Sequence, residues 1–409
     1  MHVPEGWKIK KVGELFNVQL GKMLNKKARE TSPQFSYLGN SNVRWGNFDL
    51  SDLKKMHFDE NDREKFELKK GDILLCEGGE VGRCAVWEKE VTGVYYQKAL
   101  HRLRAKNHIN GYYFQKYMDY IVNSTNLLAN YSTRTSIAHL TREKLITLKV
   151  LTPPLAEQEK IAEILSTWDH AIEQTERLKA NAETHKQALM QQLLTGKKRF
   201  PEFEGEWKEY RLSKLGETFN GLSGKTAKDF GTGKPFITYK NIFDNSKIDI
   251  TKFEYVNIED NENQQKVERG DLFFTTSSET PEEVGMSSVM LDTPTKDLYL
   301  NSFCFGLRLF EANRLLPEFA QFLFRSNHVR QKIILLAQGS TRFNLSKIAF
   351  MKIKIKLPSI EEQQKIAAVL NRADREIELL AEKLDHLKTE KRALMQQLLT
   401  GKRRVKVDG

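Results

Sequence analysis

The sequence predicts an α+β protein with two globular mixed α/β domains. These are separated by two long antiparallel helices that form a coiled coil, and the whole is a pseudo-twofold internal repeat. Two observations carry this prediction. Residues 189–197 recur identically at 394–402, 205 residues later, and residues 157–162 nearly match residues 362–367 at the same offset. In each half the two repeated segments are joined by a long stretch without Pro or Gly, residues 155–195 and 359–400. A chain of 409 residues exceeds what one hydrophobic core usually organises.

Proline and glycine mark the ends of the two long helices. Pro153-Pro154 and Pro358 stand before them, where a missing N–H costs nothing, and Gly196 and Gly401 stand just beyond them as C-terminal stops. In chain order, we therefore expect a first domain at 1–153, a first helix at 154–196, a linker at 197–205, a second domain at 206–357, a second helix at 358–401 and a basic tail at 402–409.

The two helices carry apolar residues in the 4-3 alternation of a coiled-coil seam. In the first helix the assigned seam residues are Ile161, Leu165, Trp168, Ile172, Leu189 and Leu193. In the second helix they are Ile366, Leu370, Ile377, Leu380, Leu384, Leu387, Leu394 and Leu398. The centre of the first seam is weaker, because Thr175, Lys179 and Ala182 occupy its positions.

Three lysines interrupt the seam, Lys179 and Lys186 in the first helix and Lys391 in the second. Antiparallel pairing without a stagger sets Trp168 opposite Lys391 and Lys186 opposite Ala373. The indole can then cover the stem of Lys391 or interact with its charge, and the small Ala373 leaves room for Lys186 to reach water.

The globular parts read as mixed structure in which strands predominate. Residues 70–74 and 269–273 share a Gly-Asp turn followed by apolar residues, so strands are expected at 72–76 and 271–275. Residues 352–357 alternate lysine with apolar residues, as a half-buried strand does. Helices are expected at 112–122 and 316–336, the latter with its apolar positions on one side.

Composition limits the class of protein. Lys and Arg number 65 against 54 Asp and Glu, a net charge of +11 that suits a polyanionic partner. With 39% hydrophobic residues the chain is globular, which excludes a disordered tail protein. Cys76, Cys84 and Cys304 show no C-x-x-C spacing and are expected to be reduced core residues. No apolar run approaches membrane-spanning length and the start lacks a signal peptide, so we expect a cytoplasmic protein without membrane contact.

Motifs of self-sufficient enzymes are missing from the sequence. Gly221-Leu222-Ser223-Gly224-Lys225-Thr226 resembles a phosphate loop but has two residues between its glycines instead of four. There is no Asp/Asn-Pro-Pro-aromatic motif, no Pro-Asp, no G-x-S-x-G and no metal-binding His or Cys cluster. We expect no catalytic residue, no metal ion and no directly bound cofactor.

Three functional classes differ in how many of these features they explain. A DNA-recognition subunit explains the basic charge and the repeat of two differing domains. A fused nuclease or methyltransferase requires motifs that the sequence lacks. A coiled-coil scaffold explains the helices but not two large basic domains.

The arrangement resembles the DNA-specificity subunit of type I restriction–modification enzymes. The residues that carry the resemblance are 154–162 with 189–197, their copies at 358–367 and 394–402, and the pieces Gly6-Trp7-Lys8, 70–75 and 221–226. In that family two variable target-recognition domains alternate with two conserved helical regions. The likeness covers nearly the whole chain, although residues 1–150 and 206–355 align with one another only patchily.

The resemblance implies a non-catalytic subunit that assembles with two modification subunits, which use S-adenosylmethionine. Restriction subunits that hydrolyse ATP with Mg²⁺ join the same complex. Each target-recognition domain is expected to read one half of a bipartite, asymmetric site on double-stranded DNA. The paired helices space the domains and dock the modification subunits. Because different domains stand in a repeated frame, the two half-sites should differ.

Polar and basic residues at expected turns and strand ends are the candidate DNA contacts, since such side chains read base edges and phosphates. In the first half they are Tyr37, Asn40, Asn42, Arg44, Arg83, Gln97, Lys98 and Arg134. In the second half they are Tyr239, Lys240, Asn241, Ser277, Asn301 and Arg342, with Ser278 beside them. The repeated Ser-Thr-Arg triplets at 132–134 and 340–342 combine hydroxyls with a cation, as phosphate sites do. A solvated loop residue is the alternative for each.

Overall fold

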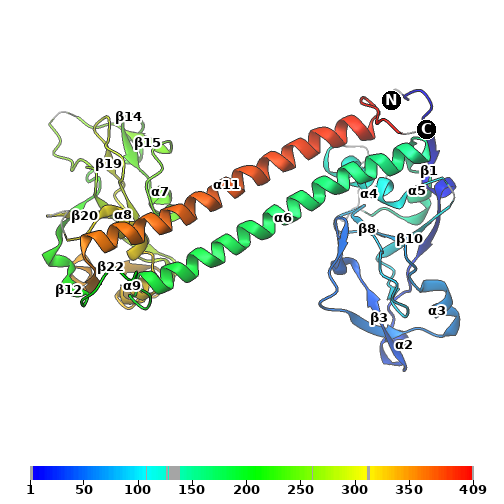
Figure 1. Ribbon diagram of the computed structural model, residues 1–409, viewed down its shortest axis with the longest axis horizontal. Helices are drawn as coiled ribbons and strands as arrows, with labels where there is room; N and C mark the ends of the chain where they lie inside the picture. The colour runs from blue at the N-terminus through cyan, green and yellow to red at the C-terminus, as the bar shows by residue number, and fades with distance from the viewer. Residues whose placement is uncertain are drawn as a thin grey trace. The chain divides into compact units, whose positions relative to one another are not determined.

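The computed structural model describes residues 3–106, 108–125, 128, 139–259, 261–310 and 314–407. The chain divides into two compact units (Figure 1). Unit 1 comprises Met1–Glu176 and Glu382–Gly409, and unit 2 comprises Arg177–Ala381. Each unit therefore contains one globular domain and a part of both long helices.

The globular part of unit 1 contains three sheets and a two-stranded ribbon. Its helices are α1 (Val12–Leu15), α2 (Lys26–Glu30), α3 (Glu60–Phe66), α4 (Gly111–Asn123) and α5 (Arg142–Thr147). Its strands are β1 (Lys8–Lys11), β2 (Phe16–Leu20), β3 (Gln34–Leu38), β4 (Val43–Arg44), β5 (Asn47–Phe48), β6 (Lys54–His57), β7 (Ile73–Cys76), β8 (Cys84–Val86), β9 (Tyr95–Tyr96), β10 (Leu100–Ala105) and β11 (Lys149–Thr152). The largest sheet has the order β2-β10-β7-β8 and is antiparallel.

Unit 2 is likewise built of short helices and strands. Its helices are α7 (Tyr239–Asp244), α8 (Pro317–Leu323), α9 (Asn327–Ile334) and α10 (Lys347–Phe350). Its strands are β12 (Lys208–Arg211), β13 (Gly216–Asn220), β14 (Phe230–Ile237), β15 (Phe253–Val256), β16 (Leu272–Thr275), β17 (Ser277–Ser278), β18 (Ser287–Val289), β19 (Tyr299–Leu300), β20 (Cys304–Leu309), β21 (Ala337–Gln338), β22 (Phe343–Leu345) and β23 (Lys354–Leu357).

The main sheets of the two units correspond, whereas β4-β5 of unit 1 and β17-β22-β21 of unit 2 have no counterpart among the described residues. The sheet β2-β10-β7-β8 has its counterpart in β13-β20-β16-β18, and β6-β3-β9 has its counterpart in β15-β14-β19. In each of the smaller sheets one pairing is parallel, β3 with β9 and β14 with β19. The pair β1-β11 likewise corresponds to β12-β23. The internal repeat predicted from the sequence is thus confirmed at the level of topology.

The long helices are α6 (Leu155–Leu193) and α11 (Ile360–Leu399). Within each unit they lie side by side and run antiparallel (Figure 1): Asp169 pairs with Lys391 in unit 1, and Lys186 pairs with Asp374 in unit 2. All twenty positions of the 4-3 pattern are buried or half-buried in the two helices. Most residues between those positions are exposed, so one apolar stripe of each helix faces its partner.

Local signals explain where the shorter elements begin and end. Strands 73–76 and 272–275 follow Gly71 and Gly270, whose positive φ angles form the predicted turns. Strand β23 exposes Lys354 and Lys356 and buries the residues between and after them, as the alternation predicts. The expected helix 316–336 is wrong as one element. It breaks into α8 and α9 because the Ser326 side chain accepts a hydrogen bond from the N–H of Val329 and caps a new helix.

Every globular part is organised around buried apolar clusters. In unit 1 the larger cluster joins the sheet β2-β10-β7-β8 and helix α4 to the first turns of α6 and the last turns of α11. In unit 2 the larger cluster joins the corresponding sheet to the last turns of α6 and the first turns of α11. The ends of the long helices therefore belong to the domain cores. Within the described residues no helix combines the length and apolarity needed to cross a membrane.

Candidate nucleic-acid interface

In unit 2 the ends of several strands bring one set of loops together. The Thr276 N–H donates to the Phe303 carbonyl (2.9 Å), and the Leu345 N–H donates to the Thr276 carbonyl (2.8 Å). The Gly221 N–H donates to the Cys304 carbonyl (3.3 Å). We use the name loop face for the surface formed by Asn220, residues 301–303, residues 340–342 and Lys347. Asn301 and Arg342 of the predicted contacts lie on it.

A glycine in each unit holds the neighbouring loop close. A Cβ atom on Gly221 would lie 2.0 Å from the Asn301 carbonyl oxygen, and one on Gly21 would lie 2.3 Å from the Gln97 carbonyl oxygen. Only glycine permits this approach, so Gln97 and Asn301 occupy equivalent places. Lys225 of the supposed phosphate loop forms an ion pair with Glu262 and lowers the pKa of that carboxyl to about 2. The Gly221–Thr226 motif therefore serves packing and a structural ion pair.

Asn40 and Arg83 of unit 1 lie together, and most of their polar groups are already bonded. Arg83 donates to the carbonyl oxygen of Asn40 (3.0 Å) and to Glu80 (2.7 Å). The Asn40 amide donates to the Gly78 carbonyl (2.9 Å). These bonds fix the turn that follows β7, beside the half-buried Gln97. Whether they also contact DNA stays a prediction.

Asn42 and Asn241 are not available to DNA, which corrects the sequence-based assignment. Both are buried, and their amides are satisfied by the backbone. The Asn42 amide donates to the carbonyls of Asp49 (3.0 Å) and Asp52 (3.1 Å). The Asn241 amide donates in the same way to residues 249 (2.9 Å) and 252 (3.0 Å). Each asparagine therefore closes a loop of its own unit.

The loops closed by these asparagines share a feature that sequence reasoning missed. Asp49 accepts hydrogen bonds from the N–H and hydroxyl of Ser51 (3.1 and 2.6 Å). Asp249 accepts the same two bonds from Thr251 (3.0 and 2.6 Å). An offset of 200 residues between Asp-Leu-Ser and Asp-Ile-Thr was the signal that could have revealed this turn.

Four further candidates are withdrawn from the surface: Tyr37, Ser277 and Ser278 are buried, and Tyr239 is half-buried. Tyr37 is buried in a core cluster of unit 1, and burial raises the pKa of its phenol. Ser277 and Ser278 are buried in β17, where the Ser278 hydroxyl donates to Glu283 (2.9 Å). The half-buried Tyr239 donates its hydroxyl to the Ser277 carbonyl (2.9 Å). A short polar run after a strand predicted exposure here, but the residues pair with β22 instead.

Four predicted basic contacts are exposed. Lys98 stands on the turn between β9 and β10, and Lys240 stands in the first turn of α7. Arg44 pairs with Asp49 (3.3 Å) and Lys240 with Asp244 (3.7 Å), both at exposed positions where such pairs contribute little. Arg342 projects from the hairpin between β21 and β22. The triplet at 132–134, including Arg134, lies outside the described residues.

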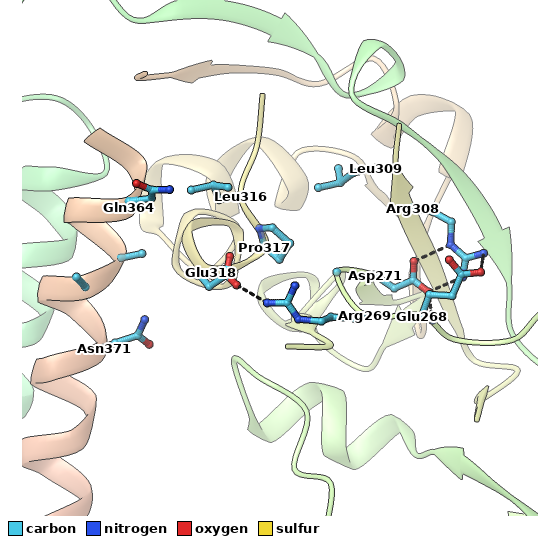
Figure 2. A pocket seen from close by; sticks show the side chains of 13 residues that line it. Glu268, Arg269, Asp271, Arg308, Leu309, Leu316, Pro317, Glu318, Gln364 and Asn371 are labelled. Carbon is cyan, nitrogen blue, oxygen red and sulfur yellow. Dashed lines mark hydrogen bonds and ion pairs between the residues drawn. The ribbon is translucent and has the colours of Figure 1, made fainter. Parts of the chain in front are cut away.

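The repeated Gly-Asp motif is structural. Asp72 and Asp271 are buried, and each accepts two bonds from one arginine of the adjacent strand, Arg104 and Arg308 (2.7 to 2.9 Å). Burial raises the pKa of Asp271, while the bonds from Arg308 lower it. Figure 2 shows Asp271 and Arg308 beside a pocket in unit 2, which has a volume of about 630 Å³. The Arg269–Glu318 ion pair (3.0 Å) lies at the same pocket. The charges near the pocket are thus paired with one another.

The repeated Glu-Gln of each long helix locks the helix to its domain. The Gln158 side chain donates to the carbonyls of residues 108 and 153 and accepts from the Asn110 N–H (2.8 to 3.1 Å). Gln363 makes the same three bonds with residues 314, 358 and 316 (2.9 to 3.1 Å). Both glutamines are fully buried. The identical sequence in the two halves therefore reflects identical structural tasks.

The preceding glutamates bind an arginine that follows the other long helix. Glu362 accepts two bonds from Arg199 (2.9 and 2.7 Å), and this arginine also donates to the Gly205 carbonyl. Glu157 is paired with Arg404, which donates to the Glu5 carbonyl (2.9 Å). Arg199 and Arg404, which follow the long helices, thus each join one end of the helix pair to the globular part of their own unit.

Lys186 and Lys391 of the seam are paired with carboxylates, which corrects the expectation that Lys186 reaches water. Cover of the Lys391 stem by the Trp168 ring stays a prediction. Lys391 lies 2.5 Å from Asp169 and 3.6 Å from Asp119. Lys186 does not extend into water. It pairs with Asp374, lies 5.6 Å from the Phe322 ring centroid and is 21% exposed. Each aspartate is one residue from the predicted facing position.

Neither a metal-binding cluster nor an exposed thiol is found among the described residues. Among the described residues, no group of three His, Cys, Asp or Glu side chains could hold a metal ion. The three cysteines are free and buried, and burial raises the pKa of Cys76 to about 11. They are core residues, as their spacing predicts.

Comparison with known proteins identifies the family. The family of the type I restriction modification DNA specificity domain matches twice, at residues 4–184 and 204–389. The MjaVIII specificity subunit of Methanocaldococcus jannaschii is 24% identical, over 99% of this chain and 95% of its own. The EcoKI specificity subunit of Escherichia coli is 26% identical, over 52% of this chain and 48% of its own.

Solved structures share the fold. The S subunit of a type I restriction–modification system from M. genitalium has a TM-score of 0.58 at 15% identity, with 97% of this chain and 98% of that chain covered. A chain from a study of complex assembly and conformational transition in the type I R-M system has a TM-score of 0.60 at 19% identity, with 98% and 100% covered. The doubled family match, with the two corresponding units, leads to one conclusion: the chain belongs to the type I restriction–modification DNA specificity family and is a specificity subunit.

Proposed function

We propose that residues 1–153 and 206–357 each read one half of a bipartite, asymmetric site on double-stranded DNA. The observation that carries this proposal is the loop before β10 and β20. Its backbone bonds are the same in both units, since Leu100 N–H donates to the Gln97 carbonyl (3.0 Å) and Cys304 N–H to the Asn301 carbonyl (3.1 Å). Its side chains differ.

The differing side chains are of the kinds that distinguish base pairs. Gln97-Lys98-Ala99 in unit 1 stands where Asn301-Ser302-Phe303 stands in unit 2. Amide side chains pair well with adenine, and basic and hydroxyl side chains bond base edges or phosphates. A constant backbone with changed side chains is how one fold reads two sequences. A net charge of +11 supplies general attraction for DNA.

We further propose that this chain has no catalytic activity of its own and works in a cytoplasmic complex. In that complex, α6 and α11 dock two modification subunits, which bind S-adenosylmethionine. Restriction subunits supply ATP-dependent cleavage with Mg²⁺. The exposed arginines on the outer face of α11, Arg372 and Arg375, support protein docking there, because arginine is enriched at protein interfaces.

The domain assignment is tested by exchange. Residues 206–355 are replaced by the corresponding segment of a relative with a known half-site, and methylated adenines are mapped in cells that express the whole complex. We expect one half-site to change and the other to persist. A change in both half-sites would contradict modular reading, and no change would contradict reading by this domain.

The absence of intrinsic activity is tested with the purified chain. Alone, it should transfer no methyl group and cut no DNA, and methylation should appear when modification subunits and S-adenosylmethionine are added. Methylation by the isolated polypeptide, with contaminating enzymes excluded by mass spectrometry, would overturn this part of the proposal.

A further inference from the structure

Phe303 is an exposed aromatic side chain on a fixed backbone. Its N–H donates to the Asn301 side chain (2.8 Å), and its carbonyl accepts from Thr276 (2.9 Å). Gly221 packs directly against the backbone of the same loop. Nevertheless 56% of Phe303 is exposed. A large apolar side chain is therefore held out to solvent by a loop whose polar backbone groups are satisfied.

The surroundings of Phe303 are basic. The Arg342 guanidinium lies 5.9 Å from the centroid of its ring. Arg342 is exposed on the hairpin between β21 and β22. Lys347 belongs to the same surface and bonds the side chain of Asn220. An exposed apolar ring beside an exposed guanidinium suits a partner that presents apolar groups next to a negatively charged backbone.

The first unit lacks this ring. Ala99 occupies the equivalent place, since Glu77 N–H donates to its carbonyl (3.0 Å) as Thr276 does to that of Phe303. The frame of the loop therefore does not require an aromatic residue. A property confined to one of two domains in a shared frame is suited to distinguishing the two half-sites.

We infer that Phe303 reads a thymine of the second half-site by contact with its 5-methyl group in the major groove, while Arg342 holds the adjacent phosphate. The inference rests on the proposed DNA recognition by residues 206–357. Among the base edges of the major groove, the thymine methyl is the apolar group, and phenylalanine is one of the side chains that contact it. The polar neighbours at 301 and 302 favour a base edge over insertion between stacked bases.

The test uses the complex assembled with its modification subunits and duplexes carrying its mapped site. Each thymine of the second half-site, on either strand, is replaced singly by uracil, which lacks the methyl group. In the native complex we expect one replacement to weaken binding about fivefold or more. In Phe303→Ala that replacement should change binding less than twofold, because the ring that senses the methyl is gone.

Phe310→Ala is the matched control. Phe310 follows β20 immediately, whereas Phe303 precedes it, and the two are similarly exposed at 60% and 56%. A six-residue strand separates them by roughly 20 Å. Phe310→Ala should retain the full uracil effect. Phe303→Leu, which keeps an apolar tip, should retain part of it and shows that the loop still folds.

Specific results would overturn the inference. They are an undiminished uracil effect in Phe303→Ala, the same loss in Phe310→Ala, or no uracil-sensitive thymine in the second half-site. The domain exchange separates this failure from failure of the proposed function. If the half-site moves with residues 206–355 but the uracil effect is independent of Phe303, recognition by the domain stands and the role of Phe303 falls.

Discussion

Where unit 2 packs Phe322 against Lys186, unit 1 places Lys116 beside Asp169. These positions correspond, because the preceding turns bond Gln158 and Gln363 in the same way. Each unit keeps a lysine–aspartate pair between the long helices. The neighbour of that pair is an apolar ring in one unit and a second lysine in the other.

A second exchange occurs inside the main sheets. His101 of β10 and Phe305 of β20 hold equivalent places, and both are fully buried. The histidine donates its Nε2–H to the Leu140 carbonyl (2.9 Å), while its Nδ1 has no partner among the described residues. The shared fold therefore accepts a buried polar side chain in place of an apolar one where a nearby carbonyl takes its hydrogen bond. Four experiments test how the two units differ.

The largest difference is expected for the separated halves. A fragment of residues 201–409 should form a stable homodimer, because self-pairing of α11 stacks Ile377 on Leu387 and Leu380 on Leu384. Residues 1–200 should dimerise at least about tenfold more weakly, since Thr175 and Lys179 meet at their centre. Sedimentation of both fragments at matched concentration measures this. Equal dimerisation, or a tighter N-terminal dimer, would show that the assigned seam does not hold the helices together.

The next largest effect concerns the neighbours of the helix pair. Phe322→Ala should lower the free energy of unfolding of unit 2 by about 3–5 kcal/mol, because it empties a fully buried site. Lys116→Ala should lower that of unit 1 by only about 1–2 kcal/mol, since Asp169 keeps Lys391. Urea denaturation followed by hydrogen exchange in each unit separates the two. A larger loss from Lys116→Ala would mean that the charged cluster, rather than apolar packing, stabilises unit 1.

A smaller effect should distinguish the units by pH. Burial lowers the pKa of His101, so the unfolded chain binds this proton more readily than the folded one. The stability of unit 1 is therefore complete above the ordinary histidine pKa of about 6.5 and declines as pH falls below it. Hydrogen exchange of β10 should accelerate under mild acid more than that of β20. His101→Phe should remove the difference, and an unchanged difference would assign it to other groups.

The smallest effect is expected at the loop face. Arg342→Ala should weaken binding of the assembled complex to many sequences alike and reduce the salt dependence by about one counterion, as loss of a phosphate contact does. Lys70→Ala is a control, because Lys70 is also exposed but is not among the predicted DNA contacts. Binding measured over a salt series decides between the roles. Loss of discrimination at one base pair would make Arg342 a base reader instead.

Four of the candidate contacts show how far prediction from the sequence extends. Arg342 and Lys98 are exposed where the turn signals predict. Asn42 and Asn241 have the composition of a DNA contact but close loops through backbone carbonyls seven to eleven residues away. Composition reveals that a side chain can form hydrogen bonds. It does not reveal whether the side chain bonds to the backbone of its own domain or is left free to bond to DNA.

The internal repeat, the two long helices and the seam could all be predicted from the sequence alone. These follow from local periodicity and from identical residues at a fixed offset, which need no knowledge of distant contacts. The tertiary structure was needed to show that Lys116 forms an ion pair with Asp169, 53 residues later in the chain. It was also needed to show that Lys186 and Lys391 of the seam are paired with carboxylates. The reason is physical: burial and pairing depend on which segments pack together, and segments far apart in the chain carry no periodic signal of their meeting.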